Sequence, residues 1–340
     1  MASSGVRLAF PAQFEVALSE LVTVVIPAYN ARSTIDETLR SVRAQSWTNL
    51  DIIVVDDGSR DDTGDIARCH AALDSRIRVH RQENAGVAIA RNTGARLARS
   101  DLLSFVDSDD LWTPDKTERQ LAALRAGGSS TGLVYSWYSV IDGDSRITAE
   151  WPGPTHQGDV LGALFRENFI GNGSSVLVRR AAFEAAGGFE PALHWAGAQG
   201  CEDILFYCRV AEHFDFAVAP GYLIGYRELA NNMSSNLPRM LRSWLLVVDE
   251  MRARHPDKLD ALSAGLDHFA RWLVRKAILT DQPNQLPKLV LRSASRSPKL
   301  ALDLLRREIP RTWSDHRRDA KRAKAATAAP CRRFVIGDPG

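Results

Sequence analysis

Apolar runs alternate with segments of helical periodicity through the first third of the chain, and two of these runs lead directly into clusters of aspartates. The runs at 52–55 and 102–106 are followed by Asp56-Asp57-Gly58-Ser59 and Asp107-Ser108-Asp109-Asp110. Repeated strand-helix-strand units predict an α/β fold with an open, mainly parallel sheet flanked by helices. Such sheets bind ligands at the carboxyl ends of their strands. We therefore expect both acidic clusters to border one crevice.

The expected elements follow from apolar spacing and from turn residues. Strands are expected at 21–26, 52–55, 77–80, 102–106, 133–141 and 174–178. Helices are expected after Ser33 and at 61–72, 87–98, 114–125, 201–212, 241–254, 259–279, 286–293 and 300–308. Pro27 should end the first strand, and two overlapping capping boxes, Ser33 with Asp36 and Thr34 with Glu37, should begin the first helix.

Composition narrows the class of protein. The 340 residues carry 43 Lys+Arg against 41 Asp+Glu, so the net charge is close to zero. This balance gives no sign of a nucleic-acid partner. The 4 cysteines form no C-x-x-C pair, which argues against a zinc module or a redox motif. No window approaches the roughly 18 apolar residues of a membrane span, and the first twenty residues lack the apolar core of a secretory signal. A cytoplasmic protein is expected, with any membrane contact peripheral.

The Asp-x-Asp segment after the strand at 102–106 suits a divalent metal. Asp107 and Asp109 point the same way in an extended segment. Mg²⁺ commonly takes one or two carboxylates while substrate phosphates complete its coordination. The expected cofactor is therefore Mg²⁺ or Mn²⁺, held together with a diphosphate.

Four motifs, taken in order, resemble the nucleotide-binding half of family 2 glycosyltransferases, which have the GT-A fold. They are Pro27-Ala28-Tyr29-Asn30, Asp56-Asp57-Gly58-Ser59, Asn84-x-Gly86 with Ala90-Arg91-Asn92, and Asp107-Ser108-Asp109-Asp110. The resemblance implies inverting transfer of a sugar from a nucleotide-sugar, most often a UDP-sugar. The acceptor would be a hydroxyl of a glycan or lipid-linked glycan in surface polysaccharide synthesis.

The resemblance also implies a domain organisation. Residues 1–20 would be an extension and 21–235 the GT-A domain, divided into a nucleotide-binding half at 21–112 and an acceptor half at 113–235. The remaining 236–340 would be a helical region with a basic tail.

Roles for single residues follow from the same resemblance. Pro27, Ala28 and Tyr29 should lie along the uracil and ribose, and Asp57 should accept a hydrogen bond from the base. Arg91 is expected near the diphosphate or base, Asp107 at the ribose, Asp109 at the metal, and Asp110 in a structural role. Arg227 is the cationic candidate for the phosphates, because Leu229 occupies a position where the family often has a histidine.

The acceptor half carries Gly187-Gly188-Phe189 and then Glu202-Asp203, again as in this family. Asp203 is the expected general base, since direct displacement needs a carboxylate that takes the acceptor's hydroxyl proton. Two acids at a helix start could instead only stabilise the helix dipole. Trp195 and Glu202 are candidate acceptor contacts.

The tail at 306–333 places ten basic residues against three acidic ones. It is either a solvated helix or a segment attracted to anionic lipid head groups. Two other functions remain open from sequence. One is a non-catalytic nucleotide-sugar-binding protein or an inactive family member, at which Leu229 hints, and the other is a phosphoacceptor signalling domain. The chain length and the second acidic cluster argue against the latter.

Overall fold

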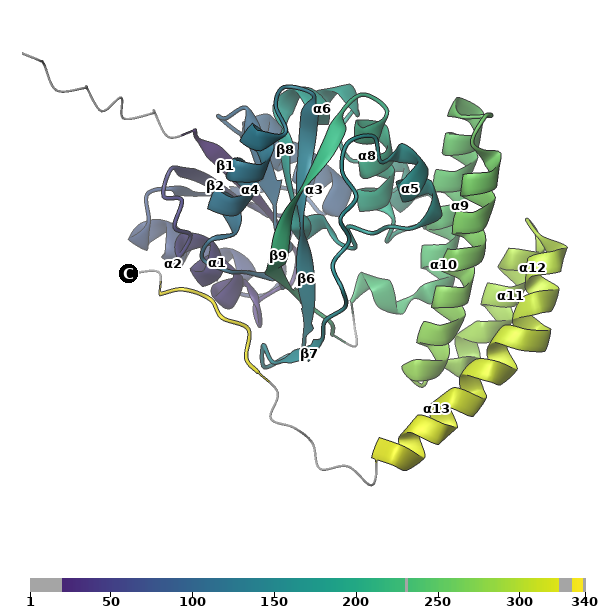
Figure 1. Ribbon diagram of the computed structural model, residues 1–340. Coiled ribbons are helices and arrows are strands. Elements are labelled where there is room, and N and C mark those ends of the chain that lie inside the picture. The colour runs from purple at the N-terminus through teal and green to yellow at the C-terminus, as the bar shows by residue number, and fades with distance from the viewer. Residues whose placement is uncertain (1–19, 230–231, 324–331, 339–340) are drawn as a thin grey trace, which may run out of the picture.

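The computed structural model describes residues 20–229, 232–323 and 332–338, so most of the expected extension at 1–20 lies outside the described residues. One sheet, ordered β3-β2-β1-β4-β8-β6-β9-β5 with β7 beside β6, lies at the centre (Figure 1). Its strands are β1 (Val22–Ala28), β2 (Leu50–Asp56), β3 (Ile77–Arg81), β4 (Leu102–Phe105), β5 (Leu111–Trp112), β6 (Thr131–Ile141), β7 (Ile147–Ala149), β8 (Val176–Arg179) and β9 (Asp215–Arg227).

Helices surround the sheet and make up the C-terminal region. The α-helices are α1 (Ile35–Arg43), α2 (Thr63–Leu73), α3 (Val87–Leu97), α4 (Lys116–Ala126), α5 (Leu161–Arg166), α6 (Arg180–Ala185), α7 (Ala192–Trp195), α8 (Glu202–Ala211), α9 (Leu237–Arg254), α10 (Leu259–Leu279), α11 (Leu286–Ala294), α12 (Pro298–Asp303) and α13 (Ile309–Ala323). Short turns of other helix types are η1 (Gly173–Ser175), η2 (Met233–Ser235), η3 (Pro283–Gln285) and η4 (Leu304–Glu308). No helix in the described ranges is long and apolar enough to cross a membrane.

The sheet is parallel in its first half and mixed beyond it. Strands β3, β2, β1 and β4 pair in parallel, as expected from the alternating pattern. The second half adds the antiparallel pairs β4 with β8, β6 with β8, β6 with β7 and β5 with β9. The carboxyl ends of β2 and β4 flank that of β1, so the topology brings both acidic clusters to one edge.

Strand β1 continues through Pro27, contrary to the expected stop. The Val25 carbonyl accepts from Val106 N–H on the β4 side, and the Ala28 carbonyl accepts from Asp57 N–H on the β2 side. Alternate residues of β1 turn their backbone groups toward opposite neighbouring strands. The backbone of Pro27 therefore turns toward β4 beyond the last residue pair of β1 and β4, where no N–H donor is needed. The capping boxes are also wrong. Thr34 is the N-cap of α1 but makes no side-chain cap hydrogen bond.

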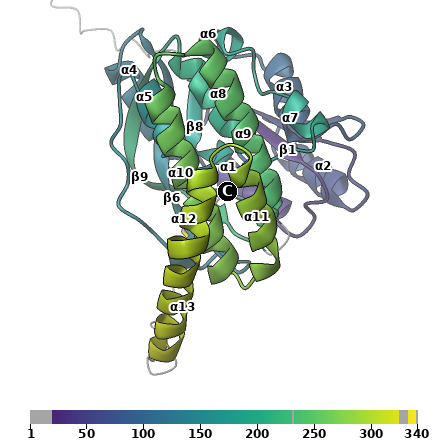
Figure 2. The same ribbon diagram turned by 90° about the vertical axis from the view of Figure 1, so that its right-hand side faces the viewer.

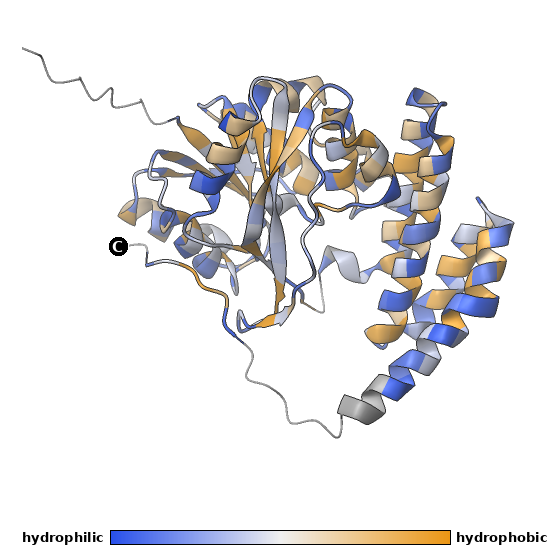
Figure 3. Ribbon diagram, in the orientation of Figure 1, coloured by the Kyte–Doolittle hydropathy of each residue, from blue (hydrophilic) through white to orange (hydrophobic). Residues whose placement is uncertain are grey.

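Each face of the sheet buries its own apolar cluster. Val24 and Ile26 pack with α1 and α4 on one face, and Val25 packs with α3, α5 and α8 on the other. The strands of the first half are largely apolar, whereas the helices carry both polar and apolar positions (Figure 3). Successive side chains of a strand point to opposite faces of the sheet. Because helices cover both faces, each face buries its own set of strand residues.

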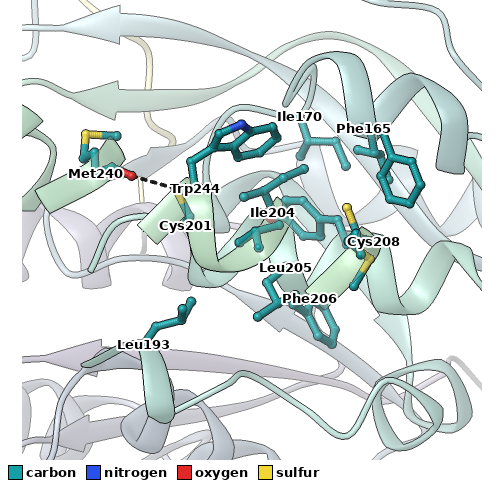
Figure 4. Packing of buried hydrophobic residues seen from close by; sticks show 14 of the residues in the cluster. Phe165, Ile170, Leu193, Cys201, Ile204, Leu205, Phe206, Cys208, Met240 and Trp244 are labelled. Carbon is teal, nitrogen blue, oxygen red and sulfur yellow. Dashed lines mark hydrogen bonds between the residues drawn. The ribbon is translucent and has the colours of Figure 1, made fainter. Parts of the chain in front are cut away.

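The C-terminal helices extend the apolar cluster that contains Val25 and do not form a core of their own. Met240 and Trp244 of α9 pack against Cys201 and Ile204, which belong to the start of α8 (Figure 4). Helix α10 packs on α5 and α9, and α13 extends away from the body of the molecule (Figures 1 and 2). The first of these helices, α9, begins at Leu237.

The last described segment returns to the sheet, which the sequence pattern does not predict. Phe334 is buried against Leu111 and Ile141, and its N–H donates to the Ser145 carbonyl at 2.8 Å. Arg333 forms an antiparallel bridge with Arg146. The tail is therefore only partly a basic helix, because residues 332–334 contact the segment between β6 and β7 and Gly337 lies near Ala44 and Pro114.

Candidate active site

Asp57 connects the end of β2 to the loop that follows β3. Its Oδ1 accepts hydrogen bonds from Gln82 Nε2 at 2.8 Å and from Ala85 N–H at 3.0 Å. Its Oδ2 accepts from Gly86 N–H at 2.9 Å, and Asn84 Nδ2 donates to the Asp57 carbonyl at 3.0 Å. The carboxylate, expected to serve the nucleotide base, is thus largely occupied by this loop. These hydrogen bonds join the Asp56-Asp57-Gly58-Ser59 motif to the Asn84-x-Gly86 motif.

The first motif is exposed at Tyr29 and Asn30. Pro27 and Ala28, expected along the uracil and ribose, have buried side chains in the strand. Tyr29 is 47% exposed just past the strand end. Asn30 turns the chain with a φ of 50°, a left-handed conformation that asparagine tolerates, and its N–H donates to Ser59 Oγ at 3.1 Å. This turn fixes Tyr29 at the edge between the two acidic clusters.

Asp107 forms a short ion pair with Arg91 of α3. Arg91 Nη2 lies 2.5 Å from Asp107 Oδ1, and the arginine is 5% exposed. The Asp107 N–H donates to Ser174 Oγ at 2.9 Å, and that hydroxyl donates to Asp110 Oδ2 at 2.5 Å. Asp110 is buried and also accepts from Arg227 N–H at 2.9 Å, which agrees with the structural role expected of it.

The Arg91 guanidinium is held by two further motifs. It lies over the Phe189 ring at 5.0 Å, and Asn92 binds both backbone groups of Phe189, at 2.7 Å and 2.9 Å. A Cβ added at Gly173 would come within 2.5 Å of Arg91 Nη2. The Ala90-Arg91-Asn92 and Gly187-Gly188-Phe189 motifs therefore position one arginine, and the small residue in η1 leaves room for it.

Asp109 is the second acid of the strand end and carries an unfavourable charge. Burial and the neighbouring charge of Asp107 raise the pKa of Asp109 to about 7, although Arg227 and Arg91 oppose that shift. Two carboxylates that repel each other in a partly buried position are stabilised by a bound cation. This electrostatic state is what a divalent metal site would require.

Asp203 lies in the first turn of α8 and faces the same group of charges. Burial raises its pKa to about 7, against the lowering effect of Arg91. Its Oδ1 accepts from Ile204 N–H at 2.7 Å, while Cys201 is the N-cap and supplies no side-chain cap. Burial lowers the pKa of Arg91. The negative charges of Asp107 and Asp203 raise it, and the pKa of Arg91 is raised overall. Arg91 is thus electrostatically coupled to a strand-end aspartate and to the helix aspartate.

Glu202 stands beside Asp203 but points into the protein. Its Oε2 accepts from Gly200 N–H at 2.7 Å, and its buried Oε1 has no hydrogen-bond partner among the described residues. Burial raises the pKa of Glu202, and Arg91 lowers it less than burial raises it. The residue is 3% exposed, so direct acceptor contact, which was expected of it, requires movement of the loop before α8.

Arg227 does not face the phosphate position expected for it. Its guanidinium donates to Glu37 Oε2 at 2.7 Å and to Ser145 Oγ at 3.1 Å. It also donates to the carbonyls of Asp109, Asp142 and Gly143. All five N–H donors are thereby engaged, and the residue is 1% exposed. Arg227 braces the segment that carries Asp109 and is not a free phosphate ligand.

Comparisons with known proteins agree with this arrangement. Residues 23–187 match the sequence profile of Glycosyl transferase family 2. Over these residues, just under half of its length, the chain is similar to family 2 glycosyltransferases. EpsH of Bacillus subtilis (strain 168), which is named as a glycosyltransferase, is 36% identical over 172 residues, covering 48% of each protein. The chain thus spans about half the length of this curated relative.

Solved structures with low sequence identity show the same fold. S. aureus TarS 1–349 in complex with UDP-GlcNAc has a TM-score of 0.59 at 16% identity, covering 89% of this chain and 92% of that one. Mannosyltransferase PcManGT of Pyrobaculum calidifontis, with GDP-Man and Mn²⁺, has a TM-score of 0.54 at 18% identity, covering 89% and 86%. The fold is the GT-A fold, and the expected fold class is confirmed with a mixed sheet.

Trp195 lies at the end of α7, shortly before α8. Its side chain is 71% exposed. The preceding His194 packs on Gly86, whose added Cβ would lie 3.0 Å from the imidazole. Helix α7 therefore rests on the loop that Asp57 holds. The indole stays open to solvent, as an acceptor platform would need.

The carboxylates of this site fit a divalent cation that is shared with a bound ligand. No group of three or more metal-type side chains gathers in the described residues, so the protein alone does not complete a coordination shell. Asp109 and Asp107 supply hard carboxylate oxygens, and Asp109 lacks a neutralising partner of its own. The Leu229 side chain lies near Gly143 and offers no ligand. One or two carboxylates plus substrate phosphates fit such a site.

Several residues of this site lack a sequence signal of their own. Ser174 links Asp107 to Asp110, and Tyr207 donates to the Asn172 carbonyl at 2.8 Å below Arg91. Ser174 falls at the start of an expected strand, and Tyr207 in an apolar helix face. Only the pairing of β4 with β8 brings Ser174 to the acidic segment.

Proposed function

We propose that the chain is an inverting glycosyltransferase that moves a sugar from a UDP-sugar to a hydroxyl of a glycan or lipid-linked acceptor in surface polysaccharide synthesis. The observation that carries the proposal is the coupling of Asp203 to Asp107 through the buried Arg91 guanidinium. It sets a candidate base opposite a candidate donor-binding edge. TarS with UDP-GlcNAc and PcManGT with GDP-Man support a nucleotide-sugar donor for this fold.

The donor would lie along the carboxyl edge of the parallel strands. Tyr29 offers its exposed ring to the base, and the remaining lone pair of Asp57 Oδ2 can accept from a base N–H. Asp107 keeps one oxygen free of Arg91 for the ribose. Arg91 places positive charge beneath the diphosphate without being exposed to solvent. Pro27 and Ala28 would contribute through the backbone of the strand end.

Transfer needs one proton acceptor. As the acceptor oxygen bonds to the anomeric carbon, Asp203 takes the hydroxyl proton, and the bond from that carbon to the diphosphate oxygen breaks with its electron pair. A base with a pKa near 7 combines sufficient basicity with a deprotonated fraction at neutral pH. Asp203 thus matches the role by position and by acidity.

Asp109, with Asp107, would hold Mg²⁺ or Mn²⁺. The bound ion would neutralise charge on the departing diphosphate. Asp109 itself contributes its carboxylate, and Arg227 fixes the backbone at that position through a 2.8 Å hydrogen bond to the Asp109 carbonyl. PcManGT with Mn²⁺ supports this cofactor for the fold.

A donor screen tests the proposal. Purified protein is incubated with UDP-, GDP- and TDP-sugars, and nucleotide release is measured with Mg²⁺, with Mn²⁺ and with excess chelator. Release is expected with one donor class and should disappear in chelator. Asp109→Asn should reduce it about 10²-fold or more. The control Asp101→Asn, whose side chain is 99% exposed, should match the wild type.

Full release in chelator would contradict the metal role. Nucleotide binding without release from any donor, in the presence of acceptor extracts, would instead favour a non-catalytic nucleotide-sugar-binding protein. We further propose that the enzyme works in the cytoplasm at the inner face of the membrane, held there by the basic surface of α13.

A further inference from the structure

A hollow lies between the loop after α7 and the starts of α9 and α11. It has a volume of about 750 Å³ and is lined by Gly197, Asn236, Arg239, Gln285, Lys288 and Arg292, among others. No acidic side chain belongs to its described lining. The wall is therefore polar and positively charged.

Four cations gather here without a carboxylate partner. Arg239 and Arg242 lie three residues apart on α9, and Lys288 and Arg292 lie four apart on α11, so each pair shares one helix face. None of the four forms an ion pair with a described acidic residue, although most other arginines of the molecule do. Arg242 reaches the wall through Gly197, whose added Cβ would lie 4.0 Å from Arg242 Nη1.

The arginines repel one another across this site. Burial lowers the pKa of Arg292, and the positive charge of Arg242 lowers it further. Arg292 donates to the Pro238 carbonyl, and Arg239 Nη1 donates to Gln199 Oε1 at 2.8 Å, so both guanidinium groups keep further N–H donors. Like charges held together in a hollow favour an anion between them.

Two helix N-termini add to the positive potential. Gln285 Oε1 accepts from Leu237 N–H at 2.9 Å, and Gln285 Nε2 donates to the Ser235 carbonyl at 3.1 Å. The first turns of α9, with 18 residues, and α11, with 9 residues, therefore meet at the hollow. Helix N-termini favour negative charge and commonly bind phosphate groups.

The hollow communicates with the acceptor side of the candidate active site. Arg239 contacts Gln199, and Gln199 Nε2 lies 2.6 Å from His194 Nδ1. Gln199 belongs to the loop that separates Trp195 from Asp203, and His194 directly precedes Trp195. Through Gln199 and His194, a group bound in the hollow lies near Trp195, the proposed acceptor platform.

We propose that this hollow binds the phosphate or diphosphate group of an anionic acceptor, an inference that rests on the proposed transferase function. The acceptor is then a glycosyl phosphate or glycosyl diphosphate, with its sugar directed toward Trp195. Charge and side-chain hydrogen-bond donors supply the recognition, and the dipoles of the two helices add positive potential. The hydroxyl that reacts belongs to the sugar, and the phosphate remains unchanged.

Calorimetry with inorganic pyrophosphate, and separately with inorganic phosphate, tests the site while saturating UDP occupies the donor edge. The variant Arg242→Gln/Lys288→Gln changes two exposed side chains. Its dissociation constant for pyrophosphate should rise tenfold or more, because two charge-assisted contacts are lost. The control Lys299→Gln/Arg252→Gln, equal in charge change and also exposed, should stay within twofold of the wild type.

The wild-type affinity should also fall as NaCl rises from 50 to 500 mM, in proportion to the charges neutralised. Equal pyrophosphate affinity in the two double variants overturns the proposal. Loss of binding to vesicles of 30% phosphatidylglycerol in phosphatidylcholine, with pyrophosphate affinity unchanged, also overturns it and assigns the cations to a bilayer surface. Absence of nucleotide release from every donor, with pocket-dependent pyrophosphate binding intact, would count against the transferase function and not against the anion site.

Discussion

At the scale of single residues, Arg91 determines how the candidate site is charged. Its guanidinium is buried beside Asp107 and stabilised by the Phe189 face, so it stays positive where burial alone would oppose it. Asp203 feels that charge and still has a raised pKa. An arginine that stabilises one carboxylate directly leaves the second basic enough to accept a proton near neutral pH.

Asp203→Asn tests this balance through rate. Turnover should fall by roughly 10²-fold or more, the usual scale for losing a general base. In the wild type the rate should rise with pH up to about 7 and then level off, since the carboxylate must be deprotonated. Initial rates between pH 5.5 and 8.5 provide the measurement. Glu202→Gln is the matched variant, and it should keep the wild-type profile.

The same variant has a predicted effect on stability. Between the ordinary pKa of 3.8 and the folded value of about 7, the native state keeps a proton that the unfolded chain has released. The free energy of unfolding should therefore fall as pH rises through this window, and Asp203→Asn should lose that decline. Melting temperatures at pH 5 and pH 8 show the difference. A variant with normal transfer and an unchanged pH dependence would exclude Asp203 from the mechanism.

Gly173→Ala tests whether the position of Arg91 matters for the donor. The added methyl would lie 2.5 Å from Arg91 Nη2 and displace the guanidinium from Asp107. Nucleotide affinity should fall about tenfold, and the free energy of unfolding by about 1–3 kcal/mol. Gly162→Ala on α5, which has open space around it, is the control and should bind nucleotide normally. Equal affinities in both variants would refute a positioning role for Arg91.

At the scale of elements, sequence patterns predicted the parallel half well and the second half poorly. The run at 52–55 is wholly β-branched and the run at 102–106 is mostly apolar, and both form strands within a few residues of the expected bounds. Strand β9 was missed because Pro220 and Gly221 interrupt its pattern. The pairing with β6 jumps from Val218 to Tyr222 around them, so a bulge tolerates both residues.

The candidate site was predictable as a set of residues and not as a set of contacts. Asp107, Asp109 and Asp203 come together because strand ends and a helix start meet at one edge. The partners of Arg227 could not be read from sequence, since Glu37 lies 190 positions away and the intervening loops set the approach. Burial of Asp57 and Arg91 likewise depends on neighbouring loops that carry no periodic signal.

The returning segment at 332–338 provides a test at this scale. Phe334 packs on Leu111, Ile141 and Gly225, whose missing side chain leaves room for the ring. Phe334→Ala should lower the free energy of unfolding by about 2–3 kcal/mol, at the lower end for a buried aromatic because the cluster is small. Urea denaturation checks this. The neighbouring Val335→Ala, 66% exposed in the wild type, should change it by less than about 0.5 kcal/mol.

At the scale of the whole molecule, the apolar core is continuous between the sheet and the C-terminal helices, whereas positive charge gathers outside that core. The apolar core continues from the sheet through α8 into α9 and α10, so the C-terminal helices cannot be removed without exposing it. Positive charge instead collects at two places outside the core, the hollow between α9 and α11 and the projecting α13. A truncation from residue 311, which sequence alone would suggest as a test of the tail, would also remove Phe334 and is therefore unsuitable.

A triple variant at Arg307, Arg311 and Arg318 tests membrane contact without that defect. These side chains are 84%, 80% and 61% exposed and lie in or beside α13, so replacing them with glutamine should leave the fold intact. Each basic residue near an anionic surface contributes about 1 kcal/mol, so the loss of three predicts roughly 10²-fold weaker binding to phosphatidylglycerol vesicles at low salt. Co-sedimentation at 20 and 300 mM NaCl measures it, and neutral phosphatidylcholine vesicles provide the baseline. If the variant sediments with anionic vesicles as well as the wild type does, the exposed arginines of α13 are only solvated, and another surface must hold the protein at any membrane.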